Sequence, residues 1–149
     1  ALEVVGLQGY EEKVPFALTK GERQRVAVAS VLAVQPKVII LDEPMTGLDY
    51  RHQRNMMEML KSLNRYGHTI IIITHSIWVA AEYAKRTIVM KEGHILLDGP
   101  TRAIFAEENR LAEASFYPPS IVRLSNWLGT EALTVQGMVQ ELKNSAGDR

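Results

Sequence analysis

Two adjacent acidic residues, Asp42 and Glu43, follow an apolar run and are candidates for metal and acid–base chemistry. The run is Val38–Leu41, and its lack of alternation predicts a parallel β-strand that is buried on both faces. Open α/β sheets bind ligands at the carboxyl ends of their strands. One carboxylate could hold Mg²⁺ while the other activates water, as in the hydrolysis of a nucleoside triphosphate. The alternative is a strand that ends in two solvated acids.

A histidine, His75, follows a second apolar run, Thr69–Thr74, which predicts another fully buried strand. Its imidazole can donate a hydrogen bond to a phosphate oxygen. With Asp42 and Glu43 one strand away, a phosphate contact is favoured over the alternative, a structural histidine that bonds to a loop carbonyl.

A helix is predicted over Gly21–Gln35. Gly21 is its first residue, and Thr19 stands two residues before it. The free N–H groups at a helix N-terminus attract anions, and glycine allows the backbone to approach a ligand closely. The alternative is that Thr19 only caps the helix. After its polar first turn the helix is apolar nearly all round, which predicts that it is buried centrally.

The elements that must position these residues follow from hydrophobic spacing and from turn residues. A helix with one buried face is predicted at Tyr50–Arg65, with Gly67 as its stop. Glu92-Gly93 predicts a hairpin between Thr87–Lys91 and His94–Asp98. Further helices are predicted at Ile77–Ala84, from a Thr101 cap through Phe105, at Glu107–Ala114, from a Ser120 cap through Leu128, and at Thr134–Leu142, with fraying over Asn144–Arg149.

The composition is that of an ordinary globular protein and excludes several classes. The 149 residues carry a net charge of zero, so no global field favours nucleic acid or an anionic membrane. The absence of cysteine excludes a disulfide scaffold and thiolate metal sites. No apolar run approaches the ~20 residues of a membrane-spanning helix.

Four motifs occur together in a fixed order: LTKGERQRVAVASVLA, VIILDEP, TGLD and ITHS. From Leu2 to about Phe105 the chain resembles the ATP-binding subunit of ABC transporters. The resemblance implies an α/β fold, the C-terminal half of a P-loop NTPase (RecA-like) core with a short helical C-terminal extension. It divides the chain into the end of a helical subdomain with the signature loop (1–20), the core part (21–105) and a helical accessory segment (106–149).

The resemblance also assigns roles at an ATP site with Mg²⁺. Asp42 matches the acid that holds Mg²⁺ through water, and Glu43 matches the general base for the attacking water. His75 matches the switch histidine.

Other residues match positions that act across a dimer. Thr19, Gly21 and Glu22 match the signature loop, which contacts the γ-phosphate of ATP held by the opposite subunit. Asp49 matches the acid that acts across the dimer interface.

The sequence departs from the family pattern in the signature and by one absence. Thr19 replaces serine and Glu22 replaces glutamine, while Lys20 replaces glycine and either assists phosphate binding or restricts the loop. The 149 residues contain no GxxxxGK[ST] phosphate loop. We therefore expect the C-terminal half of an ATPase domain that by itself neither binds ATP tightly nor hydrolyses it, and whose exposed sheet edge favours self-association.

The tail, with FYPPSIVRLSNWLG and LTVQGMVQEL, resembles the cobalt/nickel and vitamin-type energy-coupling ATPases; the alternative is a generic helical extension. This implies an importer of a small solute such as a metal ion or a vitamin. A second ATPase subunit and a transmembrane subunit would be its partners, at the cytoplasmic face of the membrane. Two other functions stay open: a non-catalytic module that lends its signature loop to a partner ATPase, and an ABC-type ATPase of DNA repair or translation, against which the neutral charge argues.

Overall fold

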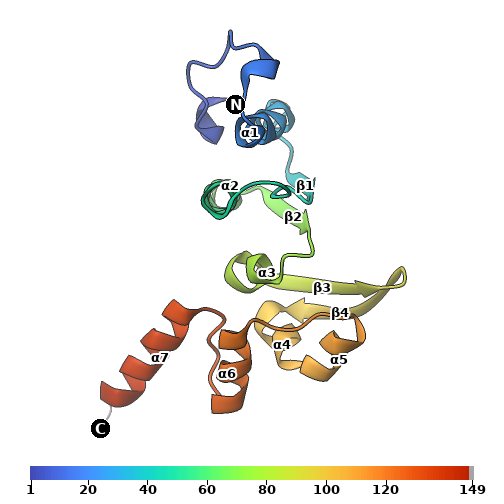
Figure 1. Ribbon diagram of the computed structural model, residues 1–149, viewed down its shortest axis with the longest axis vertical. Coiled ribbons are helices and arrows are strands. Elements are labelled where there is room, and N and C mark those ends of the chain that lie inside the picture. Colours follow the sequence, from blue (N-terminus) through green and yellow to red (C-terminus); the bar gives the residue numbers. More distant parts are fainter. Residues whose placement is uncertain (148–149) are drawn as a thin grey trace. The chain divides into compact units, whose positions relative to one another are not determined.

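The computed structural model describes residues 1–147 of the chain. The residues pack as two units, Ala1–His75 and Ser76–Arg149, and each is described by itself (Figure 1). The predicted functional segments 1–20, 21–105 and 106–149 therefore do not coincide with the packing units, and they stay a prediction.

The first unit contains two parallel strands and the helices around them. Strands β1 (Val38–Asp42) and β2 (Thr69–Ile73) pair in register from Val38 with Thr69 to Asp42 with Ile73. Because the strands are parallel, their carboxyl ends meet at the same edge. The helical elements of this unit are η1 (Glu3–Val5), η2 (Pro15–Ala17), α1 (Lys20–Leu32) and α2 (Tyr50–Arg65).

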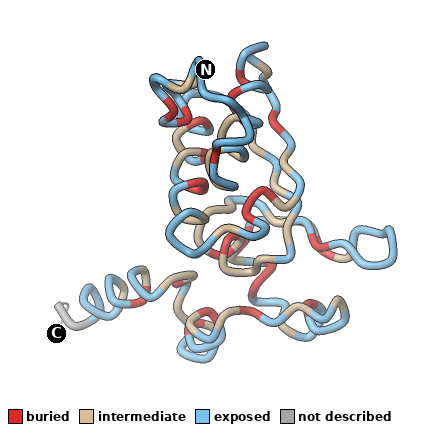
Figure 2. The backbone as a smooth tube through the Cα atoms, turned by 45° about the horizontal axis from the view of Figure 1, so that its top comes forward, coloured by how far each residue is buried: buried red, intermediate tan, exposed pale blue. Residues whose placement is uncertain are grey.

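The prediction that both strands are buried on both faces is wrong. Along β1 only Ile39 is buried, at 1% exposed, and its neighbour Ile40 is 64% exposed; along β2 half-buried and exposed positions alternate (Figure 2). Successive side chains of a strand point to opposite faces. Helix α2 contacts β2, while no element among residues 1–147 buries Ile40, Ile71 or Ile73. The apolar runs therefore form strands with one covered face.

The predicted central burial of α1 is also wrong. Only Val28, Ala29 and Leu32 of this helix are buried, and Val31 is 43% exposed. Helix α1 contacts η1, which covers part of its surface. An apolar helix surface is buried only where a neighbouring element covers it, and sequence periodicity does not identify that neighbour.

Helix α2 has the predicted bounds and the predicted single buried face. Its buried residues are Met56, Met57, Leu60 and Leu63. Gly67 follows the helix at a φ of +99°, where a side chain would be strained, so the predicted stop residue is confirmed.

The second unit is built on an antiparallel hairpin. Strands β3 (Arg86–Lys91) and β4 (His94–Pro100) pair as predicted, and Glu92 and Gly93 turn between them with positive φ angles of 50° and 78°. Two positive φ angles define the type I′ turn that matches strand twist. The helices of this unit are α3 (Ile77–Tyr83), α4 (Thr101–Ala106), α5 (Glu108–Glu113), α6 (Ser120–Leu128) and α7 (Val135–Gly147).

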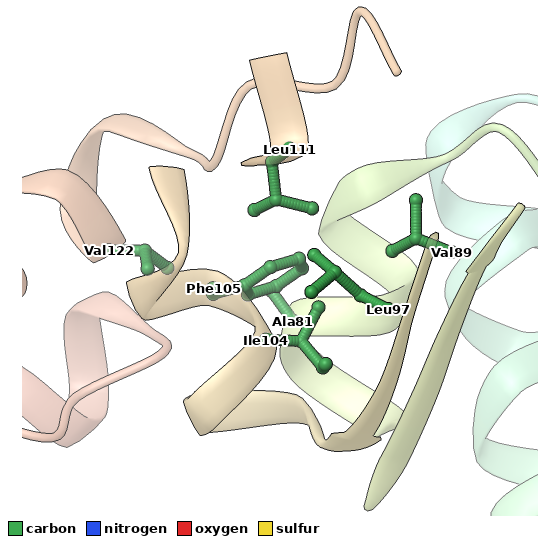
Figure 3. Packing of buried hydrophobic residues seen from close by; sticks show 7 residues of the cluster. All are labelled: Ala81, Val89, Leu97, Ile104, Phe105, Leu111 and Val122. Carbon is green, nitrogen blue, oxygen red and sulfur yellow. The ribbon is translucent and has the colours of Figure 1, made fainter. Parts of the chain in front are cut away.

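One apolar core joins the hairpin to the helices of the second unit (Figure 3). Leu97 from β4, Phe105 from α4, Leu111 from α5 and Val122 from α6 are all buried in it. Residues on both sides of position 106 therefore pack together, even though the composition changes there.

Three expectations about helix ends in this unit need correction. The hydroxyl of Thr101 does not cap α4; it donates to the Ala84 carbonyl at 2.7 Å, and Pro100 is the N-cap. Ser120 is the first residue of α6 and makes no capping bond. Helix α7 continues to Gly147, beyond the predicted end, so the predicted fraying is wrong for residues 144–147; residues 148 and 149 lie outside the described part.

Among residues 1–147, none of the helices has the length and apolar character that crossing a membrane requires.

Candidate functional site

The structure brings Glu43 and His75 together at the carboxyl ends of the paired strands. The backbone N–H of Glu43 donates to the Ile73 carbonyl at 2.9 Å, which continues the β1–β2 pairing by one residue. The backbone N–H of His75 donates to Glu43 Oε1 at 2.8 Å, and the ring atom Nδ1 lies 2.7 Å from the same oxygen. Parallel register therefore places the second acid of the LDE sequence directly beside the histidine of ITHS.

The Glu43 carboxylate is held in its charged form. Its second oxygen accepts bonds from the hydroxyls of Thr74, at 3.3 Å, and Thr46, at 3.4 Å. Partial burial raises the pKa of Glu43, but the hydrogen bonds from His75 and Thr74 outweigh it, and the pKa is lowered overall. An ionised carboxylate can only accept hydrogen bonds, so Nδ1 of His75 carries the proton of this contact. The His75 side chain is 82% exposed, so the rest of the ring is open to a ligand.

Asp42 is the last residue of β1 and is exposed. Residues 1–147 contain no cluster of three or more His, Asp or Glu residues that could hold a metal ion. A single carboxylate still fits Mg²⁺, which usually keeps several waters and binds through one or two carboxylates and the phosphates of the substrate. The role of Asp42 at a metal ion stays a prediction.

Thr19 and Glu22 form a reciprocal capping box at the start of α1. Thr19 Oγ1 accepts from the Glu22 backbone N–H at 3.3 Å. In return, Glu22 Oε2 accepts from the backbone N–H of Thr19 at 2.7 Å and from its hydroxyl at 2.8 Å. Thr19 therefore is an N-cap, as the structural alternative proposed, and its hydroxyl is fixed in direction.

Tyr10 extends this network, and the sequence analysis missed it. The Tyr10 hydroxyl donates to Glu22 Oε1 at 2.7 Å, and Lys13 Nζ lies 3.4 Å from the centre of the Tyr10 ring. The bonds from Thr19 N–H, then from Tyr10 and from the Thr19 hydroxyl, lower the pKa of Glu22 to about 2. Twelve residues separate Tyr10 from Glu22, and no motif spacing links them. Glu22 therefore does more than substitute for the glutamine of the family pattern, because its carboxylate connects the loop that contains Tyr10 to the start of α1.

Asp49 is the N-cap of α2. Its Oδ1 accepts from the backbone N–H of His52 at 2.9 Å and lies 2.8 Å from His52 Nδ1. The backbone bond and then the ring bond lower the pKa of Asp49. His52 is a second residue that the sequence analysis missed. The spacing i, i+3 after a cap was the available signal.

The Lys20 side chain packs against another loop of the same unit. It lies over Gly47 in the turn between β1 and α2, where an added Cβ would overlap with Lys20 Nζ. Gly47 also has a φ of +72°, so glycine fits this position on both grounds. The cation of the signature segment is thus in contact with the turn that ends at Asp49.

A small pocket lies between α1 and α2. Its volume is about 80 Å³, and its lining residues are Gly21, Arg25, Leu48, His52, Asn55 and Met56. Pockets for small organic ligands start at roughly 300 Å³, so this one does not accommodate a nucleotide. It does show that the first turns of α1 and α2 lie side by side.

Comparison with known proteins relates the chain to one family. Residues 1–46 match the family model described as ABC transporter. A protein of Caldanaerobacter subterraneus subsp. tengcongensis named "Putative ABC transporter ATP-binding protein" is 59% identical over 139 residues, which are 93% of this chain and 24% of that protein. The energy-coupling factor transporter ATP-binding protein EcfA of Methanocaldococcus jannaschii is 40% identical over 83% of this chain and 44% of its own length.

A solved structure supports the same relationship. CbiO1 from Clostridium perfringens, part of the ABC transporter complex cbiONQ, superposes with a TM-score of 0.67 at 37% identity, over 83% of this chain and 49% of CbiO1. The chain thus spans between about a quarter and a half of the length of these relatives. The predicted fold class, α/β as part of an ABC ATPase core, is confirmed.

Proposed function

The chain is a relative of the ATP-binding proteins of ABC transporters, and from that relationship we propose that it forms part of an ATPase that drives an importer. The observation that carries the proposal is the contact between Glu43 and His75 at the ends of two parallel strands. The proposal is supported because this contact joins a carboxylate that could accept a proton to an imidazole that could donate to phosphate, at the sheet edge where α/β proteins bind ligands.

In this proposal Glu43 accepts a proton from the water that attacks the γ-phosphate. Its lowered pKa makes it a weak base while His75 donates two hydrogen bonds to it. A γ-phosphate oxygen is an anionic acceptor and competes with Glu43 for the Nδ1–H of His75. When the His75 ring turns to the phosphate, Glu43 keeps its partial burial but loses the hydrogen bond from the ring, so its pKa rises. The base thus becomes effective when ATP is bound.

Asp42 is proposed to hold Mg²⁺ through water. When bound, the ion neutralises charge on the β- and γ-phosphates. Asp42 is exposed on the strand that leads into Glu43, so one short segment supplies both carboxylates. The ion itself would be completed by water and phosphate oxygens.

The signature segment and Asp49 are proposed to act on ATP held by a second ATPase subunit. The backbone N–H and hydroxyl groups of Thr19 are fixed by the capping box, and Gly21 leaves the backbone of the first turn open to approach. Glu22 and Tyr10 hold this loop in shape. Asp49, capping α2, would contact the same partner.

A transmembrane subunit is proposed as the other partner, with the ATPase peripheral at the cytoplasmic face of the membrane. The solute would be small, such as a metal ion or a vitamin. The support is the energy-coupling factor name of the relative from M. jannaschii and the CbiO1 structure.

One observation favours a second candidate function, a non-catalytic module that lends its signature segment to a partner ATPase. The Thr19–Glu22 segment is fully formed by its own capping box and is held by Tyr10, so it could be presented to a partner without any contribution from Glu43. In that case Thr19 and Gly21 would matter for the partner's ATP turnover, and Glu43 would not.

Substitution of Glu43 in the natural full-length protein tests the main proposal. Glu43→Gln keeps an oxygen that accepts from His75 but cannot take a proton, so we expect ATP turnover to fall by roughly 10²–10⁴-fold while ATP still binds. Glu113→Gln, on an exposed carboxylate of α5, is the matched control. Unchanged turnover in Glu43→Gln contradicts the proposal. Loss of turnover in a partner only when Thr19 and Gly21 are replaced supports the second candidate.

The 149-residue chain alone is expected to show no ATP turnover, because it contains no phosphate loop to supply ground-state affinity. Turnover by the purified chain that Glu43→Gln abolishes would contradict this expectation.

A further inference from the structure

His52 connects two segments for which the sequence suggested separate roles. On one side its backbone N–H and its ring atom Nδ1 both reach Asp49 Oδ1, at 2.9 and 2.8 Å. The lowered pKa of Asp49 keeps that carboxylate ionised at neutral pH, so Nδ1 must be the donor of this bond. The backbone N–H holds Oδ1 as the helix cap, and the position of the His52 ring decides whether the second bond to the same oxygen forms.

The same ring packs against the signature segment. A Cβ added to Gly21 would lie 3.4 Å from His52 Cδ2 and 3.7 Å from a methyl group of Leu48. The ring thus has Gly21 on one side and Asp49 on the other. Arg25 of α1 also lines the pocket that His52 lines, and it is a charged side chain of that pocket.

We propose that His52 is a positioning residue that transmits movement of the segment Thr19–Glu22 to the Asp49 carboxylate. An imidazole ring is rigid, so contact at Cδ2 moves Nδ1 as well. Hydrogen bonds weaken beyond about 3.2 Å, so a shift of about half an ångström weakens a bond of 2.8 Å. The coupling itself does not depend on the proposed function. Its consequence does rest on that function: docking of the signature segment on ATP would reorient Asp49 at the same interface.

Lys20 supports this coupling from the neighbouring position. Its side chain lies over Gly47, two residues before Asp49. The signature segment therefore contacts the Gly47–Asp49 turn through Lys20 and through His52. Of these two contacts, only that of His52 reaches the carboxylate itself.

The coupling can be measured in the chain as it stands by following the ¹³C signal of the Asp49 carboxyl group through a pH titration. Gly21→Leu puts a side chain where the ring lies, and we expect it to raise the Asp49 pKa toward its ordinary value. Gly21→Ala is the matched control, because its Cβ meets the ring at ordinary van der Waals distance and should leave the pKa low. No shift in Gly21→Leu overturns the inference.

Non-additivity separates a positioning role from a general packing effect. His52→Phe keeps a ring against Gly21 but cannot donate from Nδ1, so it should itself raise the Asp49 pKa. In the His52→Phe background Gly21→Leu should then add no further shift. An equal shift in both backgrounds overturns the inference. If Gly21→Leu does not fold, His52→Phe alone tests the inference. An unchanged Asp49 pKa in His52→Phe then overturns it.

The titration uses no nucleotide. A failed titration leaves the Glu43→Gln experiment unaffected, and a failed Glu43→Gln experiment leaves the measured coupling in place.

Discussion

Leu111 offers a sharp test of how the second unit is organised. Its side chain on α5 is 1% exposed and lies near Phe105 and Leu97 (Figure 3). Leu111→Ala removes three buried carbon atoms, which at about 0.8 kcal/mol each gives roughly 2.4 kcal/mol. The cavity that remains adds to this, so we expect the free energy of unfolding to fall by about 3 kcal/mol.

The informative measurement is amide hydrogen exchange in the hairpin β3–β4, far from Leu111 in sequence. If the hairpin and α4–α6 unfold together around one core, the loss of about 3 kcal/mol should accelerate exchange of the most protected hairpin amides about a hundredfold. Leu142→Ala, at a side chain that is 52% exposed on α7, is the matched control and should change stability by about 0.5 kcal/mol or less.

The opposite result would be equally clear. If exchange accelerates only after residue 106 while the hairpin keeps its protection, the segment 106–149 folds as an independent accessory element. The shared core would then not make residues 76–147 cooperative, and the reasoning from burial would be refuted.

Three further predictions concern single contacts. The low pKa of Glu22 contributes stability that is fully present above pH 4.5 and is lost as pH falls toward 2; Glu22→Gln should abolish this dependence in acid unfolding, and an unchanged profile would contradict the capping network. Thr101→Val removes the hydroxyl of a buried residue that donates to the Ala84 carbonyl and should cost about 1–3 kcal/mol in urea unfolding, whereas a neutral effect would refute the role of that bond. Arg86→Gln breaks an exposed pair with Asp98 and should leave the midpoint of urea unfolding nearly unchanged, because exposed ion pairs contribute little; a clear loss of stability would show that the pair is more than a surface contact.

Local features of the sequence were sufficient for several elements. The bounds of α2 and the pairing of β3 with β4 follow from hydrophobic spacing and from Glu92-Gly93, because helix periodicity and turn chemistry act within a few residues. The position of Glu43 beside His75 was also accessible, since two consecutive strands in parallel register carry their next residues to one edge.

Other features could not be predicted, because their partners are distant in the chain. Tyr10 reaches Glu22 across twelve residues, and no spacing rule joins a loop tyrosine to a helix cap. The Thr101 hydroxyl bonds to the Ala84 carbonyl and does not cap α4, because the hairpin brings that carbonyl within hydrogen-bonding distance. In both cases the tertiary fold brings the two hydrogen-bonding groups together.

The sequence by itself determined where the strands and helices lie, which side chains stand at the strand ends, and the family to which they point, because these depend on residue type and spacing. Only the tertiary structure decided which faces are covered. The same apolar pattern that predicted strands buried on both sides left Ile40 and Ile73 exposed, because burial requires a neighbouring element on each face. It also decided that Tyr10 bonds to Glu22 of the Thr19 capping box, since a hydrogen bond depends on the distance between atoms and not on their separation along the chain.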